Sequence, residues 1–116
     1  MKALFYTREF PPYVYGGAGV HVEYLAAELS KLIEVEDQDV QSDQLSVKGF
    51  PFENPVFNEA DSKLKTVFKT LSTNVHMNAE TIDADVIHCH TWYAQFAGIL
   101  AKLCYGIPLI ITTHSL

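Results

Sequence analysis

The stretch FPPYVYGGAGVH, residues 10–21, joins an apolar strand to an amphipathic helix through two prolines and three glycines. The strand is predicted over residues 3–7, where apolar and aromatic residues follow one another as in strands buried on both faces. The helix is predicted to start near residues 17–19, because three leucines between residues 25 and 32 recur at helical spacing. A strand followed at once by a helix indicates an α/β fold.

The glycines of this stretch indicate a loop that approaches a ligand. Gly16, Gly17 and Gly19 let the backbone come close to another group, and the amides at a helix N-terminus attract anions such as phosphate. His21 follows in the first turn of the helix. The alternative is that the glycines only permit a tight turn from strand to helix.

Apolar strands and amphipathic helices alternate along the rest of the chain. Further strands are predicted over residues 33–36, 45–50, 85–90 and 109–113, and further helices over 59–78 and 92–103. This order predicts an α/β, Rossmann-like three-layer sandwich with a mostly parallel sheet. Trp92 and Phe96 head the apolar face of the third helix, so we expect them in the core.

Composition limits the class of protein. The 116 residues suffice for one small domain, and the formal net charge of −6 argues against a nucleic-acid partner. No apolar run approaches the roughly 20 residues of a membrane span, and the N-terminus does not resemble a secretory signal, so we expect a cytoplasmic protein without a membrane partner. Cys89 and Cys104 show no disulfide or zinc-ribbon spacing and are expected to be free, buried thiols.

A second group of residues lies where the predicted strand 85–90 ends. Ligands of open α/β sheets gather at the carboxyl ends of strands, which places His90, Thr91 and Trp92 at a site. His114 ends the last strand in the same way, so one rim collects histidines and glycines. His88 faces the same way as His90 and is expected to bond a backbone carbonyl as a structural residue.

Other kinds of site fit the sequence less well. His88 and His90 with Cys104 or His114 are zinc-type ligands, but no zinc-binding motif accompanies them, and we expect neither a metal nor a cofactor. The glycine loop begins too far from its strand for a dinucleotide fingerprint. No serine-hydrolase elbow occurs.

Five segments together carry a resemblance to a known family. The segments are residues 7–12, 15–22, 85–93, 106–108 and 112–116. In order and spacing they resemble the N-terminal domain of bacterial glycogen synthases (the starch synthase catalytic-domain type) and related retaining glycosyltransferases, most of all actinobacterial members that use ADP-glucose or a close relative. The resemblance implies a GT-B architecture, in which two Rossmann-like domains enclose the active site.

The resemblance also implies roles for individual residues. Gly16 and Gly17 match the glycine pair near the donor diphosphate, and His114 matches a catalytic histidine beside the transferred sugar. The segment from His90 to Trp92 matches the acceptor side of the cleft, with Thr91 where the wider group often has an acid. The implied partners are a nucleotide sugar, ADP- or UDP-glucose, and an α-glucan acceptor.

The chain departs from the family in two places. The segment after Val35 is short, and the chain stops at Leu116, before the nucleotide-sugar domain of its relatives. We therefore expect residues 1–116 to be a partial N-terminal domain, the incomplete half of a GT-B fold, inactive alone and prone to form homo-oligomers through an exposed sheet edge. The alternatives are a non-catalytic glucan-binding or assembly module and a small nucleotide-binding protein.

Overall fold

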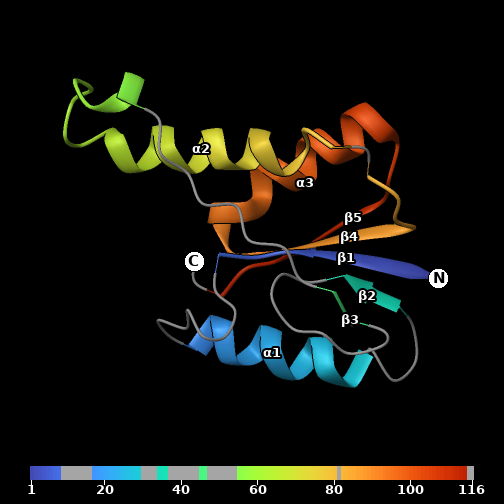
Figure 1. Cartoon of the computed structure of the whole chain (residues 1–116). Helices are drawn as coiled ribbons and strands as arrows, with labels where there is room; N and C mark the ends of the chain where they lie inside the picture. Colours follow the sequence, from blue (N-terminus) through green and yellow to red (C-terminus); the bar gives the residue numbers. More distant parts are fainter. Residues whose placement is uncertain (9–16, 30–33, 37–44, 47–54, 81, 115–116) are drawn as a thin grey trace.

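A parallel sheet forms the centre of the computed structural model, which describes residues 1–8, 17–29, 34–36, 45–46, 55–80 and 82–114. The strand order is β3-β2-β1-β4-β5, and every pairing between neighbours is parallel. Helix α1 covers one face of the sheet, and α2 and α3 cover the other (Figure 1). The strands are β1 (Lys2–Tyr6), β2 (Glu34–Glu36), β3 (Leu45–Ser46), β4 (Val86–His90) and β5 (Leu109–Thr112). The predicted Rossmann-like three-layer architecture is confirmed.

The order of the strands reverses between β1 and β4. From β1 the chain leads to α1 (Gly17–Leu29) on one face, and from β4 it leads to α3 (Trp92–Tyr105) on the other. In a doubly wound sheet such a reversal opens a crevice outside the carboxyl ends of the two strands. The register brings these ends level, with Tyr6 opposite Cys89 and His90 opposite Thr112.

Each face of the central strands carries its own apolar cluster. Ala3 and Phe5 of β1 pack with Val22 and Ala26 of α1. The alternate residues face α2 and α3, and the buried members of that cluster are Tyr6, Met77, Ile87, Cys89, Ala94, Ala97, Ala101 and Ile107. This alternation follows from the twofold side-chain period of a strand buried on both sides.

Helix α3 packs on the sheet through small residues, contrary to the expectation from its large ones. Its buried residues are Ala94, Ala97, Gly98 and Ala101, whereas Trp92 is 47% exposed and Leu103 76% exposed. Phe96 is only partly buried. The prediction of a core Trp92 was wrong because the helix lies too close to β4 and β5 for large side chains at the contact.

Helix α2 (Lys65–Met77) is shorter than the predicted helix over residues 59–78. Before it lie the short 3₁₀ helix η1 (Pro55–Phe57) and turns, and Asp61 accepts a 2.8 Å bond from the Lys63 amide. An aspartate that bonds an amide two residues on favours a turn over a helix interior. The predicted apolar stripe is on the outside of α2, since Leu64, Val67, Phe68, Leu71 and Val75 are all exposed.

A buried asparagine, which the apolar pattern did not indicate, joins α2 to α3. The Nδ2 group of Asn74 donates to the carbonyl of Tyr93 at 2.6 Å, and its Oδ1 accepts from the amide of Ala97 at 2.7 Å. Asn74 is 1% exposed, so its polar atoms need such partners. These bonds fix the first turns of α3 against α2.

The structure tests the sequence predictions for the end of α3 and for the two cysteines. Gly106 ends α3 with φ 69°, the left-handed conformation expected of a helix cap. Both cysteines are free, but only Cys89 is buried, and the prediction of a buried thiol was wrong for Cys104. Burial raises the pKa of the Cys89 thiol to about 12.

Other predictions fall outside the described residues or stay untested. Gly16, most of the proline loop, the shortened segment after Val35 and the chain end at Leu116 lie outside them. Strand β5 is an edge of the described sheet and exposes Ile110 and Ile111, while self-association through it stays a prediction. No helix within the described ranges is long and apolar enough to cross a membrane.

Replacing Gly98 with alanine should destabilise the fold. An added Cβ would collide with Cys89 Sγ and lie 2.6 Å from Leu109 Cδ1. Overpacking of this kind costs about 1–3 kcal/mol of unfolding free energy, which urea titration measures. Gly17→Ala is the control, because a Cβ there meets no atom within 4 Å. A Gly98→Ala variant as stable as the Gly17→Ala variant would contradict the packing described for α3.

Candidate functional site

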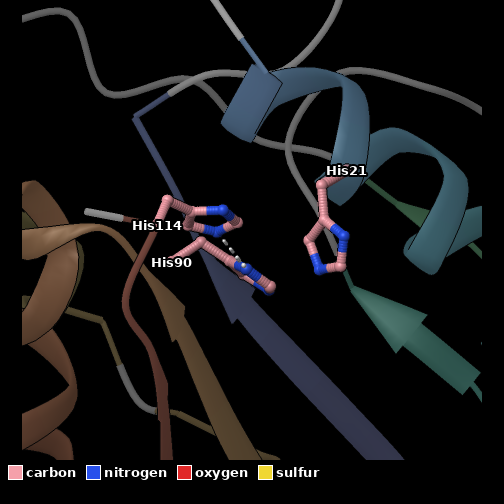
Figure 2. A group of neighbouring side chains, drawn as sticks. All are labelled: His21, His90 and His114. Carbon is pink, nitrogen blue, oxygen red and sulfur yellow. Dashed lines mark hydrogen bonds between the residues drawn. The ribbon is translucent and has the colours of Figure 1, made fainter. Parts of the chain in front are cut away.

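Three histidines meet at the edge of the sheet where the strand order reverses between β1 and β4. His90 ends β4, His114 follows β5 and His21 lies near the start of α1 (Figure 2). The ring centroid of His21 is 5.8 Å from that of His90 and 5.2 Å from that of His114. The ring centroids of His90 and His114 are 5.6 Å apart. The sequence prediction that strand ends bring these residues to one rim is confirmed.

His90 is the buried member of this cluster, which we call the histidine cluster (His21, His90 and His114). Its relative exposure is 0%, and its ring packs 5.3 Å from the ring of Phe5 and 4.1 Å from that of His88. Its Nδ1 lies 3.3 Å from His114 Nε2. Its Nε2 is buried and has no hydrogen-bond partner among the described residues.

Burial keeps the His90 ring neutral. Loss of hydration, with a smaller effect of the neighbouring rings of His88, His114 and His21, lowers the pKa of His90 to about 3. Burial also lowers the pKa of His88. At neutral pH, the bond between His90 and His114 therefore carries one proton on one of its two nitrogens. His90 thus serves to orient His114 rather than to act as a cationic acid.

His88 takes a structural part, as predicted, but with a different partner. Its Nε2 lies 2.6 Å from Thr112 Oγ1, so it bonds a hydroxyl rather than the expected backbone carbonyl. This bond links β4 to β5 just below the histidine cluster. It fixes the spacing of the two strands whose ends carry His90 and His114.

Thr91 holds the junction between β4 and α3 in a strained conformation. Its φ of 68° and ψ of 161° lie in a region that is otherwise occupied almost only by glycine. The amide of Thr91 donates to the carbonyl of Thr112 at 3.2 Å, and its carbonyl accepts from Ala94 at 3.3 Å. The strain is concentrated at the residue between His90 and Trp92, which indicates a constraint imposed by the site.

An aromatic surface borders the histidine cluster along the chain. Trp92 is half exposed, and its ring centroid is 4.2 Å from that of Tyr93. The guanidinium of Arg8 lies over the Tyr93 ring, 4.0 Å from its centroid. Stacking on an aromatic face suits arginine and holds its charge in place. A surface of this kind can contact both the apolar and the anionic parts of a ligand.

The described glycines of the loop lie at the start of α1. Gly17 is exposed and opens the helix, and Gly19 is buried in its first turn. A Cβ at Gly17 would meet nothing within 4 Å, so packing among the described residues does not require this glycine. The first amides of any helix lack intrahelical partners and favour an anion.

Comparison with known proteins identifies the family. The sequence model of glycosyltransferase family 4 matches residues 15–116. The chain belongs to glycosyltransferase family 4. It is 40% identical to an alpha-maltose-1-phosphate synthase of Mycolicibacterium smegmatis and 39% identical to one of Mycobacterium tuberculosis, each over 119 aligned residues that cover the whole chain. The chain spans 29% of the length of these curated relatives.

The comparisons confirm the predicted resemblance to glycosyltransferases as a class. The finer resemblance to glycogen synthases stays a prediction, because the relatives carry a different name. The bond between His90 and His114 and the stacking of Arg8 on Tyr93 were not predicted from the sequence. No local sequence signal could have indicated the first of them, because His90 and His114 meet only through the pairing of β4 with β5.

Replacing Thr91 with glycine should stabilise the chain. Glycine adopts φ 68° without the strain of about 1–3 kcal/mol, and the added freedom of the unfolded chain costs about 0.5–1 kcal/mol, so a net gain near 1 kcal/mol is expected. Urea unfolding measures the gain. Thr91→Ala removes the same buried hydroxyl, which has no partner among the described residues, but keeps the positive φ, so it should gain less stability than Thr91→Gly. Equal effects of the two variants would contradict backbone strain.

The buried, neutral His90 should make stability depend on pH. The pKa of His90 is 6.5 when exposed and about 3 in the fold, so the unfolded chain binds the proton more readily between these values. Stability should therefore fall as the pH drops from about 6.5 toward 3, by up to about 1.4 kcal/mol per pH unit from this group. The lowered pKa of His88 acts in the same direction.

Urea midpoints between pH 7 and 4 test this dependence. His90→Phe removes the titrating ring and should flatten the slope, whereas His76→Ala, an exposed histidine of α2, should leave it unchanged. The same slope in His90→Phe as in the unmodified chain would show that His90 is not the group responsible.

Proposed function

We propose that this chain forms the acceptor-side half of the active site of a retaining nucleotide-sugar glucosyltransferase with GT-B architecture. The observation that carries the proposal is the histidine cluster at the sheet edge where the strand order reverses, beside the start of α1. Family membership supports the reaction class. A second domain, which the relatives' greater length allows, would supply most contacts to the nucleotide.

The residues of the site divide by position. His114 is exposed and held by His90, so it can present its ring to the transferred sugar. The amides at the start of α1, which opens at Gly17, would suit a diphosphate placed at this end of the helix. Trp92 and Thr91 border the acceptor side, with Arg8 on Tyr93 as the nearby cation.

The reaction needs positioning more than a strong acid or base. The bond from the sugar's anomeric carbon to the diphosphate breaks, the acceptor oxygen bonds that carbon, and the proton of the acceptor hydroxyl passes to an oxygen of the departing diphosphate. Holding both substrates in one crevice removes much of the entropic barrier, and hydrogen-bond donors stabilise the charge on the departing diphosphate. A neutral His90 suits this role because it contacts and orients the His114 ring without adding a buried charge to the site.

The relatives favour a phosphorylated acceptor. Alpha-maltose 1-phosphate is a disaccharide phosphate, and a glucosyltransferase that makes it joins a glucosyl unit to glucose 1-phosphate. The guanidinium of Arg8, stacked on Tyr93 shortly after His90 in the chain, is suited to such a phosphate. We therefore place glucose 1-phosphate ahead of the α-glucan acceptor predicted from the sequence.

A chimaera tests the proposal. Residues 1–116 replace the matching segment of the Mycolicibacterium smegmatis relative, and glucosyl transfer from ADP-glucose is measured with glucose 1-phosphate and with glycogen as acceptors. Transfer to glucose 1-phosphate is expected, with His114→Ala lowering kcat by roughly 100-fold or more, as loss of a transition-state contact does. His76→Ala is the matched control and should keep full activity.

Two results would count against the proposal. A folded chimaera without transfer to either acceptor would overturn the function, and unchanged kcat in His114→Ala would overturn the role of that histidine. Preference for glycogen would reject the phosphorylated acceptor and favour the glycogen-synthase type. Circular dichroism of each variant establishes that it is folded.

A further inference from the structure

A side chain of α2 takes a place in the hydrogen-bond ladder of α3. A regular α-helix joins the carbonyl of one residue to the amide four residues on, which in α3 would pair Tyr93 with Ala97. Asn74 binds both of these groups, since its Nδ2 donates to the Tyr93 carbonyl at 2.6 Å and its Oδ1 accepts from the Ala97 amide at 2.7 Å. A side chain inserted into this ladder changes the direction of a helix at that turn.

The surroundings of Asn74 admit only one orientation of its amide. The second hydrogen of Nδ2 goes to the carbonyl of Thr70 at 2.7 Å, so two carbonyls surround Nδ2 while an N–H group faces Oδ1. Asn74 is buried, so water cannot replace these partners. Because Thr70 belongs to α2, this helix is the support from which Asn74 holds α3 (Figure 1).

The first turn of α3 departs from regular helix geometry and needs such a support. Thr91 precedes it with a φ of 68°, and the Ala94 amide donates to the Thr91 carbonyl, three residues back, at 3.3 Å. Strained backbone of this kind persists only where surrounding contacts hold it. The bond from Asn74 to the Tyr93 carbonyl is such a contact, two residues beyond Thr91.

The same turn carries the aromatic surface of the site. The ring of Tyr93 lies against that of Trp92, with 4.2 Å between their centroids, and under the guanidinium of Arg8. Asn74 holds the backbone of Tyr93, so a change in the direction of this turn moves both rings and the cation stacked on them.

We propose that Asn74 is a positioning residue for acceptor binding, because its inserted amide sets the direction of the first turn of α3 and thereby the place of Trp92 and Tyr93. The link to the acceptor rests on the proposed function, whereas the control of the turn does not. Asn74 is buried, so it acts through α3 and not by contact with a substrate.

Fluorescence of the 116-residue chain tests the control of the turn, because Trp92 is its only tryptophan. Asn74→Ala removes the inserted amide and lets the Ala97 amide pair with the Tyr93 carbonyl, which keeps both groups bonded while the turn changes direction. The emission maximum and the acrylamide quenching constant of Trp92 should therefore shift. Circular dichroism establishes that the variant is folded. Asn74→Leu, which also lacks an amide, provides a second variant.

Asn78→Ala is the matched control. Asn78 also joins α2 to α3, by a 3.0 Å bond from its Nδ2 to the Ala97 carbonyl, but it does not bond the first turn. Its replacement should lower the Tm and leave the Trp92 signal unchanged.

Kinetics of the chimaera described above test the link to the acceptor. Asn74→Ala should raise KM for the acceptor that the unmodified chimaera uses by roughly 10-fold, as loss of a hydrogen bond to a charged group does, and leave KM for ADP-glucose unchanged. Asn78→Ala should change neither KM. A merely structural role of the contacts between α2 and α3 would not produce this difference.

Four results would overturn the proposal. An unchanged Trp92 signal in the folded Asn74 variants, or failure of both to fold, would contradict the exchange of bonds at the turn. An unchanged acceptor KM in an active Asn74→Ala chimaera would remove the link to the acceptor, and an equal rise in Asn78→Ala would show general stabilisation instead of positioning. An inactive unmodified chimaera would overturn the proposed function and the acceptor link with it, while the fluorescence test would still decide whether Asn74 directs α3.

Discussion

The parallel pairing of β4 with β1 on one side and β5 on the other is the constraint on which the site depends. It makes three carboxyl ends level, so that His90 and the residues after β1 and β5 share one edge. The bond from His88 to Thr112 and the contact of Phe5 with both histidines of β4 hold this alignment. Without that register His90 and His114 would not meet.

Burying a histidine at the edge of a sheet has an energetic cost and a structural benefit. Hydration of the His90 cation is lost, so the ring stays neutral and its charge cannot repel the other imidazoles. A neutral ring with a fixed orientation can then set the orientation of an exposed one, here His114. The backbone of the adjacent Thr91 is strained, as is common for residues next to functional sites.

The sequence predicted the layers, the mostly parallel pairing and the rim because these follow from periodicity and from the chirality of parallel sheets. It failed where packing depended on distance rather than on pattern. The apolar face of α3 suggested Trp92 and Phe96 as core, yet alanines and Gly98 make the contact because the helix lies so close. The bonds of Asn74 and the pairing of His90 with His114 join residues remote in sequence, which no local pattern reports.

The contact of Gly98 with Cys89 and Leu109 also bears on how this fold can vary. Position 98 has room for a hydrogen only, because Cys89 and Leu109 fill the space beyond it. A family member with a larger residue in the helix would need smaller ones in both strands, so the three positions should covary in volume. Changes of side-chain volume at position 98 are therefore coupled to β4, the strand that carries His90.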